Sequence, residues 1–300
     1  MSAVTTVPPA APSAPRRPPN RLRAVRALVR RPVAVVGLLV LAVVVVAAAL
    51  GEQLAPYPAN AVDVARALQP PSGEHLFGTD ELGRDVFSRV LLAARVSVQV
   101  ALVSVTIALV AGVLLGVVAG YFGGWLDTVI MRSADVLFAF PVMLLAMAIV
   151  AILGPGLTTA MVAIGVVYIP IFARVTRASV LGVRTEPYVR AAVSLGAGPG
   201  RVIGRHVLPN IAAPIIVQTS LSLAFAILSE ASLSFLGLGV QPPEPSWGRM
   251  LFDARGFLDQ AWWMSIFPGA AVFVTVLACN LVGDALRDVL DVRADTGGKP

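Results

Sequence analysis

Few side chains of this 300-residue chain are of types that do chemistry, and those few are widely separated in the sequence. The two histidines, His75 and His206, have no cysteine or carboxylate around them at metal-ligand spacing, and Cys279 is the only cysteine. A His/Cys metal centre needs a cluster of ligands, and a disulfide needs a second cysteine. We therefore expect no metal site, no disulfide scaffold and no catalytic residues.

Nucleotide chemistry is equally restricted, because Lys299 is the only lysine and lies in the tail. A Walker A loop holds phosphates with a lysine that directly precedes Ser or Thr, and the chain has no such pair. We expect no cofactor on this chain. Any ATP and Mg²⁺ must then be bound by partner chains.

The elements that position the remaining polar residues are apolar helices. Apolar residues make up 57% of the sequence, charged residues 13%, and the mean hydropathy is +0.83, which excludes both a soluble globule and a disordered chain. The apolar residues form runs of the length that crosses a membrane as a helix. The sequence predicts an all-α polytopic membrane protein with about six spans, at residues 33–51, 96–120, 136–153, 157–173, 212–235 and 265–283.

Basic residues predict the orientation of these spans. The N-terminal arm, the second and fourth connections and the C-terminal tail carry 17 Lys and Arg, against 6 on the opposite side. The positive-inside rule therefore places both termini in the cytoplasm. The sequence pI of about 10.4 then reflects topology and contact with anionic lipid headgroups, so nucleic-acid binding is a poor explanation of it.

These patterns divide the chain into predicted segments. They are a disordered basic arm (1–31), a first span that is too long for a signal peptide (32–51), an extracytoplasmic loop with a short helix (52–94), a transmembrane core (95–283) with a cytoplasmic loop (174–209), and a cytoplasmic tail (284–300). In the extracytoplasmic loop, Thr79 or Asp80 is a candidate cap for a helix over residues 81–92.

The cytoplasmic loop contains a helix signal. Thr185 is a plausible N-cap, Glu186 and Pro187 suit a first turn, and the glycines from Gly196 to Gly200 end the helix after about ten residues. A helix this short needs a surface to pack against. That surface is either a groove on a soluble partner or the lipid headgroups, and the residues alone leave both open.

This loop resembles the EAA loop of ABC importer permeases. Arg190-Ala191-Ala192, Gly196 and His206-Val-Leu-Pro209 keep the family spacing, although Arg190 replaces a Glu and His206 an Ile. Further stretches resemble the second permease of dipeptide, oligopeptide and nickel importers. They are Pro70-Pro-Ser, His75-Leu-Phe-Gly-Thr-Asp-Glu-Leu-Gly-Arg-Asp85, Tyr121-Phe-Gly-Gly-Trp125, Leu233-Ser-Phe-Leu-Gly-Leu-Gly239, Gln241-Pro-Pro243 and Ser246-Trp-Gly248.

The resemblance implies a multi-pass protein of the bacterial inner membrane that forms half of a translocation pathway. Its implied partners are a second permease subunit, two ABC ATPase subunits and an extracytoplasmic solute-binding protein. Peptides are the implied substrates, with nickel chelates, glutathione or opine-like solutes as alternatives. The implied ATPase-coupling residues are Glu186, Tyr188, Arg190, Ala191, Ala192, Gly196 and Arg201.

Polar residues inside the fifth run permit two interpretations. Gln218, Ser222 and Ser229 share one helix face, which lines the pathway or packs against a neighbouring helix. Glu230 is the one carboxylate within an apolar run. It is a gate residue, or it is held by a hydrogen bond or by Arg84 or Arg249.

Three smaller predictions concern an ion pair, external contacts and the class of function. Arg132 and Asp135 have the spacing of a helical ion pair. Candidate contacts for the binding protein, together with Phe77, are Asp80, Glu81, Asp85, Glu244 and Trp247, unless these segments fold over their own helices. A proton-coupled secondary carrier is the alternative class of function. Such a carrier normally has several ionisable residues in its spans.

Overall fold

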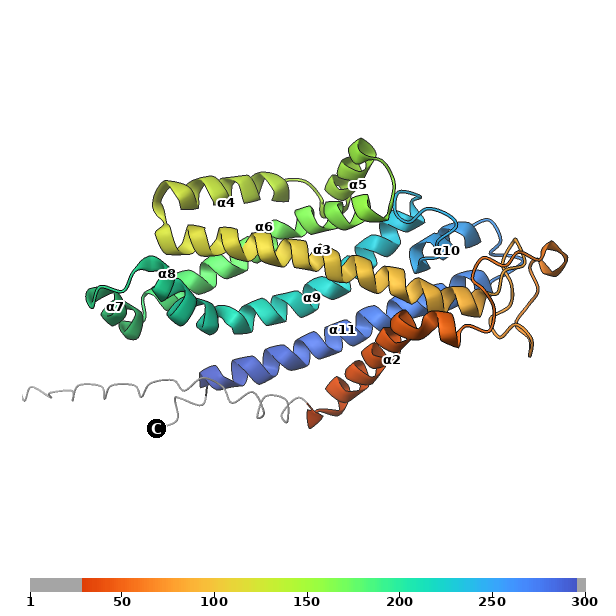
Figure 1. The fold of residues 1–300 in the computed structure, drawn as a ribbon, viewed down its shortest axis with the longest axis horizontal. Coiled ribbons are helices and arrows are strands. Elements are labelled where there is room, and N and C mark those ends of the chain that lie inside the picture. Colours follow the sequence, from red (N-terminus) through yellow and green to blue (C-terminus); the bar gives the residue numbers. More distant parts are fainter. Residues whose placement is uncertain (1–28, 296–300) are drawn as a thin grey trace, which may run out of the picture.

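The computed structural model describes residues 29–295, with side chains to residue 290. In this range the chain is an elongated bundle of helices with no strand beyond one isolated bridge (Figure 1). Five helices are long and apolar enough to cross a membrane: α2 (Pro32–Leu54), α3 (Val86–Phe122), α6 (Leu157–Arg184), α9 (Leu208–Phe235) and α11 (Trp263–Asp295). The prediction of an all-α polytopic protein is confirmed.

A sixth crossing is present only as a broken pair. Helices α4 (Gly124–Phe138) and α5 (Val142–Leu153) pass the same test together but are bent by 90°. The sequence predicted a single span over residues 136–153. The structure breaks it because Pro141 has no amide hydrogen for a continuous helix and also restricts the residue before it.

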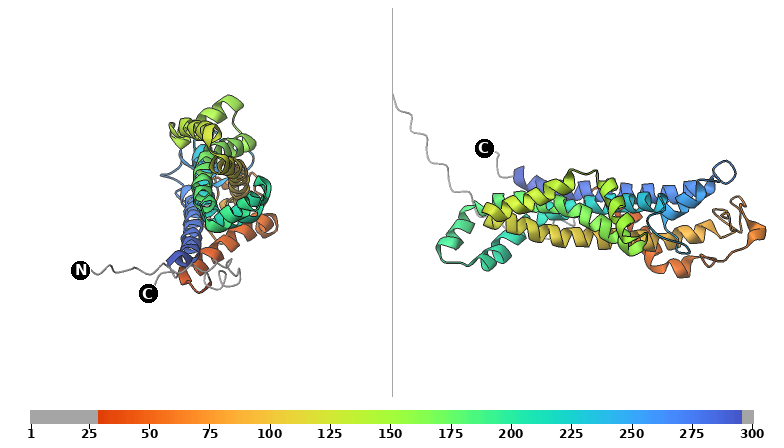
Figure 2. Two further views of the ribbon diagram at one scale, coloured as in Figure 1. Left: turned by 90° about the vertical axis from the view of Figure 1, so that its left-hand side faces the viewer. Right: turned by 90° about the horizontal axis from the view of Figure 1, so that it is seen from above.

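The two ends of the bundle differ. One end, here called the loop end, carries residues 55–85, with the 3₁₀ turn η1 (Val64–Arg66), and the short helix α10 (Trp247–Ala254). The other, here called the α7 end, carries α7 (Pro187–Ser194), α8 (Pro199–Val202) and the π-helical turn η2 (Ile203–Val207), which project beyond the long helices (Figures 1 and 2).

The most extensive helix contact joins α3 to α6, where glycines on α3 are spaced four apart. A Cβ added to Gly112, Gly116 or Gly120 would lie 2.4, 2.6 and 2.8 Å from atoms of α6. Small residues at this spacing let two spanning helices approach closely, and dispersion contacts then stabilise the pair. The stripe was legible in the sequence as three glycines at intervals of four within an apolar run.

Helix α3 replaces two predicted elements, the short helix over residues 81–92 and the span over residues 96–120. It starts later than the predicted short helix and continues through the whole predicted span. Asp85, rather than Thr79 or Asp80, caps it by accepting a hydrogen bond from the Ser88 amide. Residues 79–85 instead form a turn that is closed by the Thr79–Asp85 bridge. No Gly or Pro interrupts residues 86–111, so the predicted short helix and the second span are one helix.

Ion pairs join α4 to α6. Asp127 accepts two hydrogen bonds from Arg177, at 2.5 and 2.6 Å, and Asp135 accepts one from Arg174 at 2.6 Å. The predicted Arg132–Asp135 pair is therefore wrong, because the neighbouring helix offers Asp135 another arginine. At the same end of the bundle, Arg31 before α2 pairs with Asp288 of α11. The rest of the predicted arm (1–28) and the end of the tail (296–300) lie outside the described residues.

Candidate functional site

Helix α7 is held at one point and otherwise faces outward. Val189 is fully buried in a small apolar cluster with Val180 of α6, Val202 and Val207. Three other apolar or aromatic side chains of this segment are exposed, namely Tyr188, Val193 and Leu195, the last to 87%. One buried anchor fixes the helix in space and leaves the apolar side chains of Val193 and Leu195 accessible from outside the chain.

The sequence correctly placed a helix here, but its start differs. Glu186 is the N-cap residue, with extended backbone and Pro187 in the first turn. Thr185 belongs to the end of α6, where its hydroxyl donates a hydrogen bond to the Gly182 carbonyl. The predicted Thr185 cap is therefore wrong, since its hydroxyl is used one element earlier.

Gly196 ends α7 in a way that other residues disfavour. Its φ is +84°, its amide donates to the Val193 carbonyl, and the next amide, of Ala197, donates to the Ala192 carbonyl. This is the Schellman arrangement, in which the left-handed residue is usually glycine. A Cβ added at Gly196 would have no atom within 4 Å, so the position is open on the outside.

The other residues that were predicted to couple to an ATPase lie on the same projection. Ala191 is exposed and Ala192 half-buried, so the small-residue face is accessible. Arg190 donates a hydrogen bond to the Thr185 carbonyl and is exposed, as is Arg201 on α8. The structure thus places Glu186, Tyr188, Arg190, Ala191, Ala192, Gly196 and Arg201 together at the tip of the α7 end.

The polar residues of α9 have partners within the chain. Gln218 donates to the Ser222 hydroxyl at 3.1 Å, and Ser222 is buried. Ser229, also buried, lies 3.2 Å from the hydroxyl of Tyr168 on α6. This geometry favours helix packing over pathway lining for Ser222 and Ser229. Tyr168 was not among the predicted residues, although it was visible in the sequence as a lone tyrosine in an apolar run.

Glu230 is fully buried between α9 and α3. Ser97 of α3 donates to one carboxylate oxygen at 3.1 Å, and Ser234 donates to the other at 2.8 Å. The expected hydrogen-bonded arrangement is therefore present. Neither expected arginine is the partner, because Arg84 binds Asp80 and Glu81 whereas Arg249 binds Asp253.

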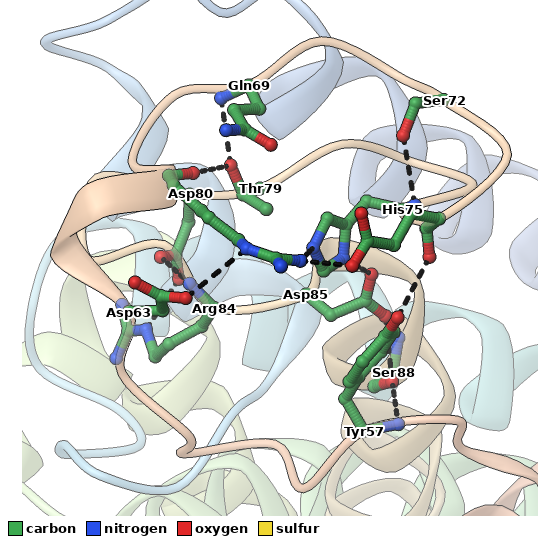
Figure 3. A network of polar contacts seen from close by, with 12 residues as sticks. Tyr57, Asp63, Gln69, Ser72, His75, Thr79, Asp80, Arg84, Asp85 and Ser88 are labelled. Carbon is green, nitrogen blue, oxygen red and sulfur yellow. Dashed lines mark hydrogen bonds and ion pairs between the residues drawn. The ribbon is translucent and has the colours of Figure 1, made fainter.

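The loop end contains a buried polar network (Figure 3). The Asp80 carboxylate accepts hydrogen bonds from the side chain and the amide of Arg84, at 2.5 and 2.9 Å, and lies 3.6 Å from Arg89. The Asp85 carboxylate lies 2.9 Å from His75 and binds the Ser88 amide and hydroxyl. These contacts fix the turn that leads into α3.

Two tryptophans attach the loop end to the bundle, and a glycine lets the loop pack closely on itself. Trp263 of α11 donates to the Thr79 carbonyl, and Trp247 of α10 donates to the Val90 carbonyl of α3, both at 3.0 Å. Gly83 has φ +74°, and a Cβ there would lie 1.8 Å from the Asp63 carbonyl. Contacts within the loop and with the bundle therefore account for the polar residues and the glycine in the segment 79–85.

The candidate contacts for a binding protein divide into two groups. Asp80, Asp85 and Trp247 are buried, so their side chains hold the loop rather than face outward. Glu81 is partly buried, and this burial, with the adjacent Asp80 carboxylate, raises the pKa of Glu81 above its usual value. Glu244 is exposed and lines an open cleft of about 540 Å³ together with Glu52, Tyr57 and Arg95.

Metal-binding geometry is absent from the part of the chain that the structure describes. There, no group of three His, Cys, Asp or Glu side chains lies together as a metal would need, and Cys279 is buried in α11. The candidate functional features of the described residues are therefore the α7 projection, the open cleft near Glu244 and the packed helices.

Comparison with known proteins agrees with this architecture. Residues 112–296 match the family described as binding-protein-dependent transport system inner membrane component. Residues 22–71 match the N-terminal TM domain of oligopeptide transport permease C.

Curated relatives cover nearly the whole chain. The dipeptide transport system permease protein DppC of Alkalihalophilus pseudofirmus is 46% identical over 90% of this chain and 89% of its own length. The glutathione transport system permease protein GsiD of Pectobacterium atrosepticum is 45% identical over 89% of both chains. The probable D,D-dipeptide transport system permease protein DdpC of Escherichia coli K12 is 46% identical over 82% of both. The chain therefore belongs to the binding-protein-dependent family of ABC transport permeases, as a multi-pass inner-membrane protein of the second-permease branch.

Proposed function

We propose that this chain forms half of the pathway of an ATP-driven importer of short peptides. In the complex it pairs with a second permease, and α7 docks on one of two ATPase subunits that bind ATP and Mg²⁺. A solute-binding protein delivers the peptide at the opposite, extracytoplasmic side. The observation that carries the proposal is the projecting α7, with its exposed apolar face and its glycine-dependent end.

The geometry of α7 supports docking on a protein over lying on headgroups. The long helices end before α7 begins, so the exposed Leu195 and Val193 project beyond the bundle (Figure 1). An apolar face at the tip of a projection suits a groove on a soluble partner. The arginines around it, including Arg190 and Arg201, suit an acidic rim on that partner.

The direction of the chain follows from this proposal together with the distribution of basic residues. If α7 docks on a cytoplasmic ATPase, the α7 end and both termini are cytoplasmic, and the loop end is extracytoplasmic. The arginine-rich segments at the α7 end agree with the positive-inside rule.

Peptides are the preferred substrates because several relatives are described as dipeptide or peptide permeases. Glutathione is the second candidate, because two relatives of about the same similarity are described as glutathione permeases. A proton-coupled carrier receives less support, since Glu230, the carboxylate buried in α9, is held by two serines within the chain.

The test is uptake into vesicles that contain the complete complex. We expect ATP-dependent accumulation of a labelled dipeptide, with glutathione at least tenfold slower. Gly196→Leu should insert and assemble normally but lower uptake at least tenfold, because leucine is strained at φ +84° and protrudes into the docking surface. Gly200→Leu is the matched control, since its Cβ also meets nothing within 4 Å and its φ is ordinary. Equal uptake by the wild type and Gly196→Leu, or accumulation by this chain alone, would contradict the proposal.

A further inference from the structure

The break between α4 and α5 lies on the surface of the bundle. Residues Ala139, Phe140 and Pro141 are all exposed, Phe140 to 54%. Figure 1 shows that α4 runs back from the α7 end beside α3 and α6 before the chain turns into α5. The break is therefore located between the two ends of the bundle, where hydrocarbon surrounds any lipid-facing surface.

Open backbone groups are costly at this position. Helix α5 begins after Pro141, and no side chain caps that end. The amides of a first helical turn have no partner within the helix. At the end of α4, the amides of Ala139 and Phe140 satisfy the carbonyls of residues 135–137, which leaves the carbonyls of residues 138–140 without a backbone donor. In hydrocarbon each unsatisfied group costs several kcal/mol, so helix breaks at membrane depth are tolerated where protein or water satisfies them.

A charged pair lies on the same face, one to two turns towards the α7 end. The side chains of Asp135 and Arg174 are 49% and 45% exposed, and the Arg174 guanidinium lies 4.2 Å from the Phe138 ring. The neighbouring pair, Asp127 and Arg177, is less exposed, at 21% and 33%. Half-exposed charges on spanning helices face an aqueous cavity or protein rather than lipid.

We infer that residues 139–141 and the Asp135–Arg174 pair line the aqueous route of the transporter and contact the passing solute. This inference rests on the proposed function and adds the face that the solute meets. The open amides and carbonyls and the half-exposed ion pair suit a route that holds water in some states of the transport cycle and a polar solute in others. Water can form hydrogen bonds with these groups whenever the solute is absent. A short peptide carries one charge of each sign at its termini, which matches one carboxylate and one guanidinium.

The test measures the accessibility of single cysteines in the complete complex. The background variant is Cys279→Ala, which removes the only cysteine of this chain. Phe140→Cys places a thiol at the break, and Val43→Cys on α2, 68% exposed, is the lipid-facing control. The probe is a charged, membrane-impermeant methanethiosulfonate reagent, which reacts with the thiolate that forms in water.

We expect Phe140→Cys to react at least tenfold faster than Val43→Cys, and saturating dipeptide to slow its reaction severalfold. Equal, slow reaction of both thiols in every nucleotide state would overturn the inference. A disulfide between Phe140→Cys and a cysteine of the second permease, without reaction with the probe, would overturn it in favour of a packed subunit interface. Uptake by the unmodified complex is measured in parallel. Its absence, with Phe140→Cys reactive, would count against the proposed function while the aqueous lining stands.

Discussion

The two ends of the molecule are built on opposite principles. At the loop end, charged and polar side chains such as Asp80, Arg89 and Thr79 are buried and find their polar partners within residues 55–85. At the α7 end, apolar side chains such as Leu195 and Val193 are exposed. The first end satisfies its polar groups within the chain, whereas the second leaves apolar surface for a partner to cover.

Because of this difference, we expect the loop end to contribute to the stability of the fold and the α7 end to contribute to transport. A buried ion network loses several kcal/mol when one member is removed, because the remaining charges lose their partner. An exposed docking helix contributes little to the fold, so its substitutions should alter transport with little effect on unfolding. Each of the following variants tests one side of this contrast.

The largest expected effect is that of Asp80→Ala at the loop end. It removes the partner of the Arg84 and Arg89 side chains and the acceptor of two backbone amides, which we expect to cost about 3–5 kcal/mol. Thermal unfolding of the purified complex measures the loss. Glu81→Ala is the control, since one Glu81 oxygen has no hydrogen-bond partner and the side chain is less buried. Equal losses in the two variants would show that the network does not depend on Asp80.

Trp263→Phe tests how firmly the loop is attached to the bundle. The Thr79 carbonyl loses the indole hydrogen bond inside a buried site, which should cost about 1–3 kcal/mol. Trp262→Phe is the control, because that neighbouring side chain is 53% exposed. Denaturant or thermal unfolding compares the pair. A larger loss in Trp262→Phe would contradict the assigned contact.

Gly196→Ala tests the end of α7 with a minimal change. Alanine at φ +84° is strained by roughly 1–2 kcal/mol, and the open surroundings add no clash. We expect faster hydrogen exchange of the α7 amides and an unchanged unfolding midpoint for the bundle. Gly182→Ala, at an ordinary helical position with equally open surroundings, should leave exchange equal or slower. Protection of α7 in Gly196→Ala equal to that in the wild type would refute the assigned strain.

The smallest effect is expected at the exposed rim of the loop end. A hydrogen bond from Arg66, and then its charge, lower the pKa of Glu74 below the ordinary value of 4.5. A lowered folded-state pKa means that the pair stabilises the fold above pH 4.5 and that this contribution is lost as pH falls through the folded value. Glu74→Gln should therefore lose less stability than the wild type between pH 6 and pH 3. Identical pH dependence in the two proteins would argue against the pair.

The sequence predicted which segments are helical better than it predicted where those helices bend or continue. The apolar runs located α2, α6, α9 and α11, because hydropathy averages report composition over about twenty residues. The same averaging passed over the break at Pro141, since apolar residues stand on both sides of it. It also separated α3 from its first turns, because Arg89 and Arg95 look extramembranous although the helix continues through them.

The ends of α7, the candidate docking helix, were predictable, because the backbone preferences of single residues define them. Gly196 and Pro187 mark the ends of α7 through their conformational preferences. Arg174, Ser97 and Tyr168, which are partners of Asp135, Glu230 and Ser229, were not predictable, because each lies on another helix and depends on how the helices pack. The spacing of residues along one helix can suggest only partners that lie on that same helix.

Cross-linking of the α7 end to an ATPase tests the central claim most directly. In the Cys279→Ala background, Leu195→Cys at the tip of the α7 end and Leu76→Cys at the loop end both carry exposed thiols. In the assembled complex, a short bifunctional thiol reagent should link Leu195→Cys to an ATPase subunit and stop ATP-driven uptake, while Leu76→Cys gives no such link. Absence of a link from Leu195→Cys in every nucleotide state, or a link from Leu76→Cys, would contradict the account.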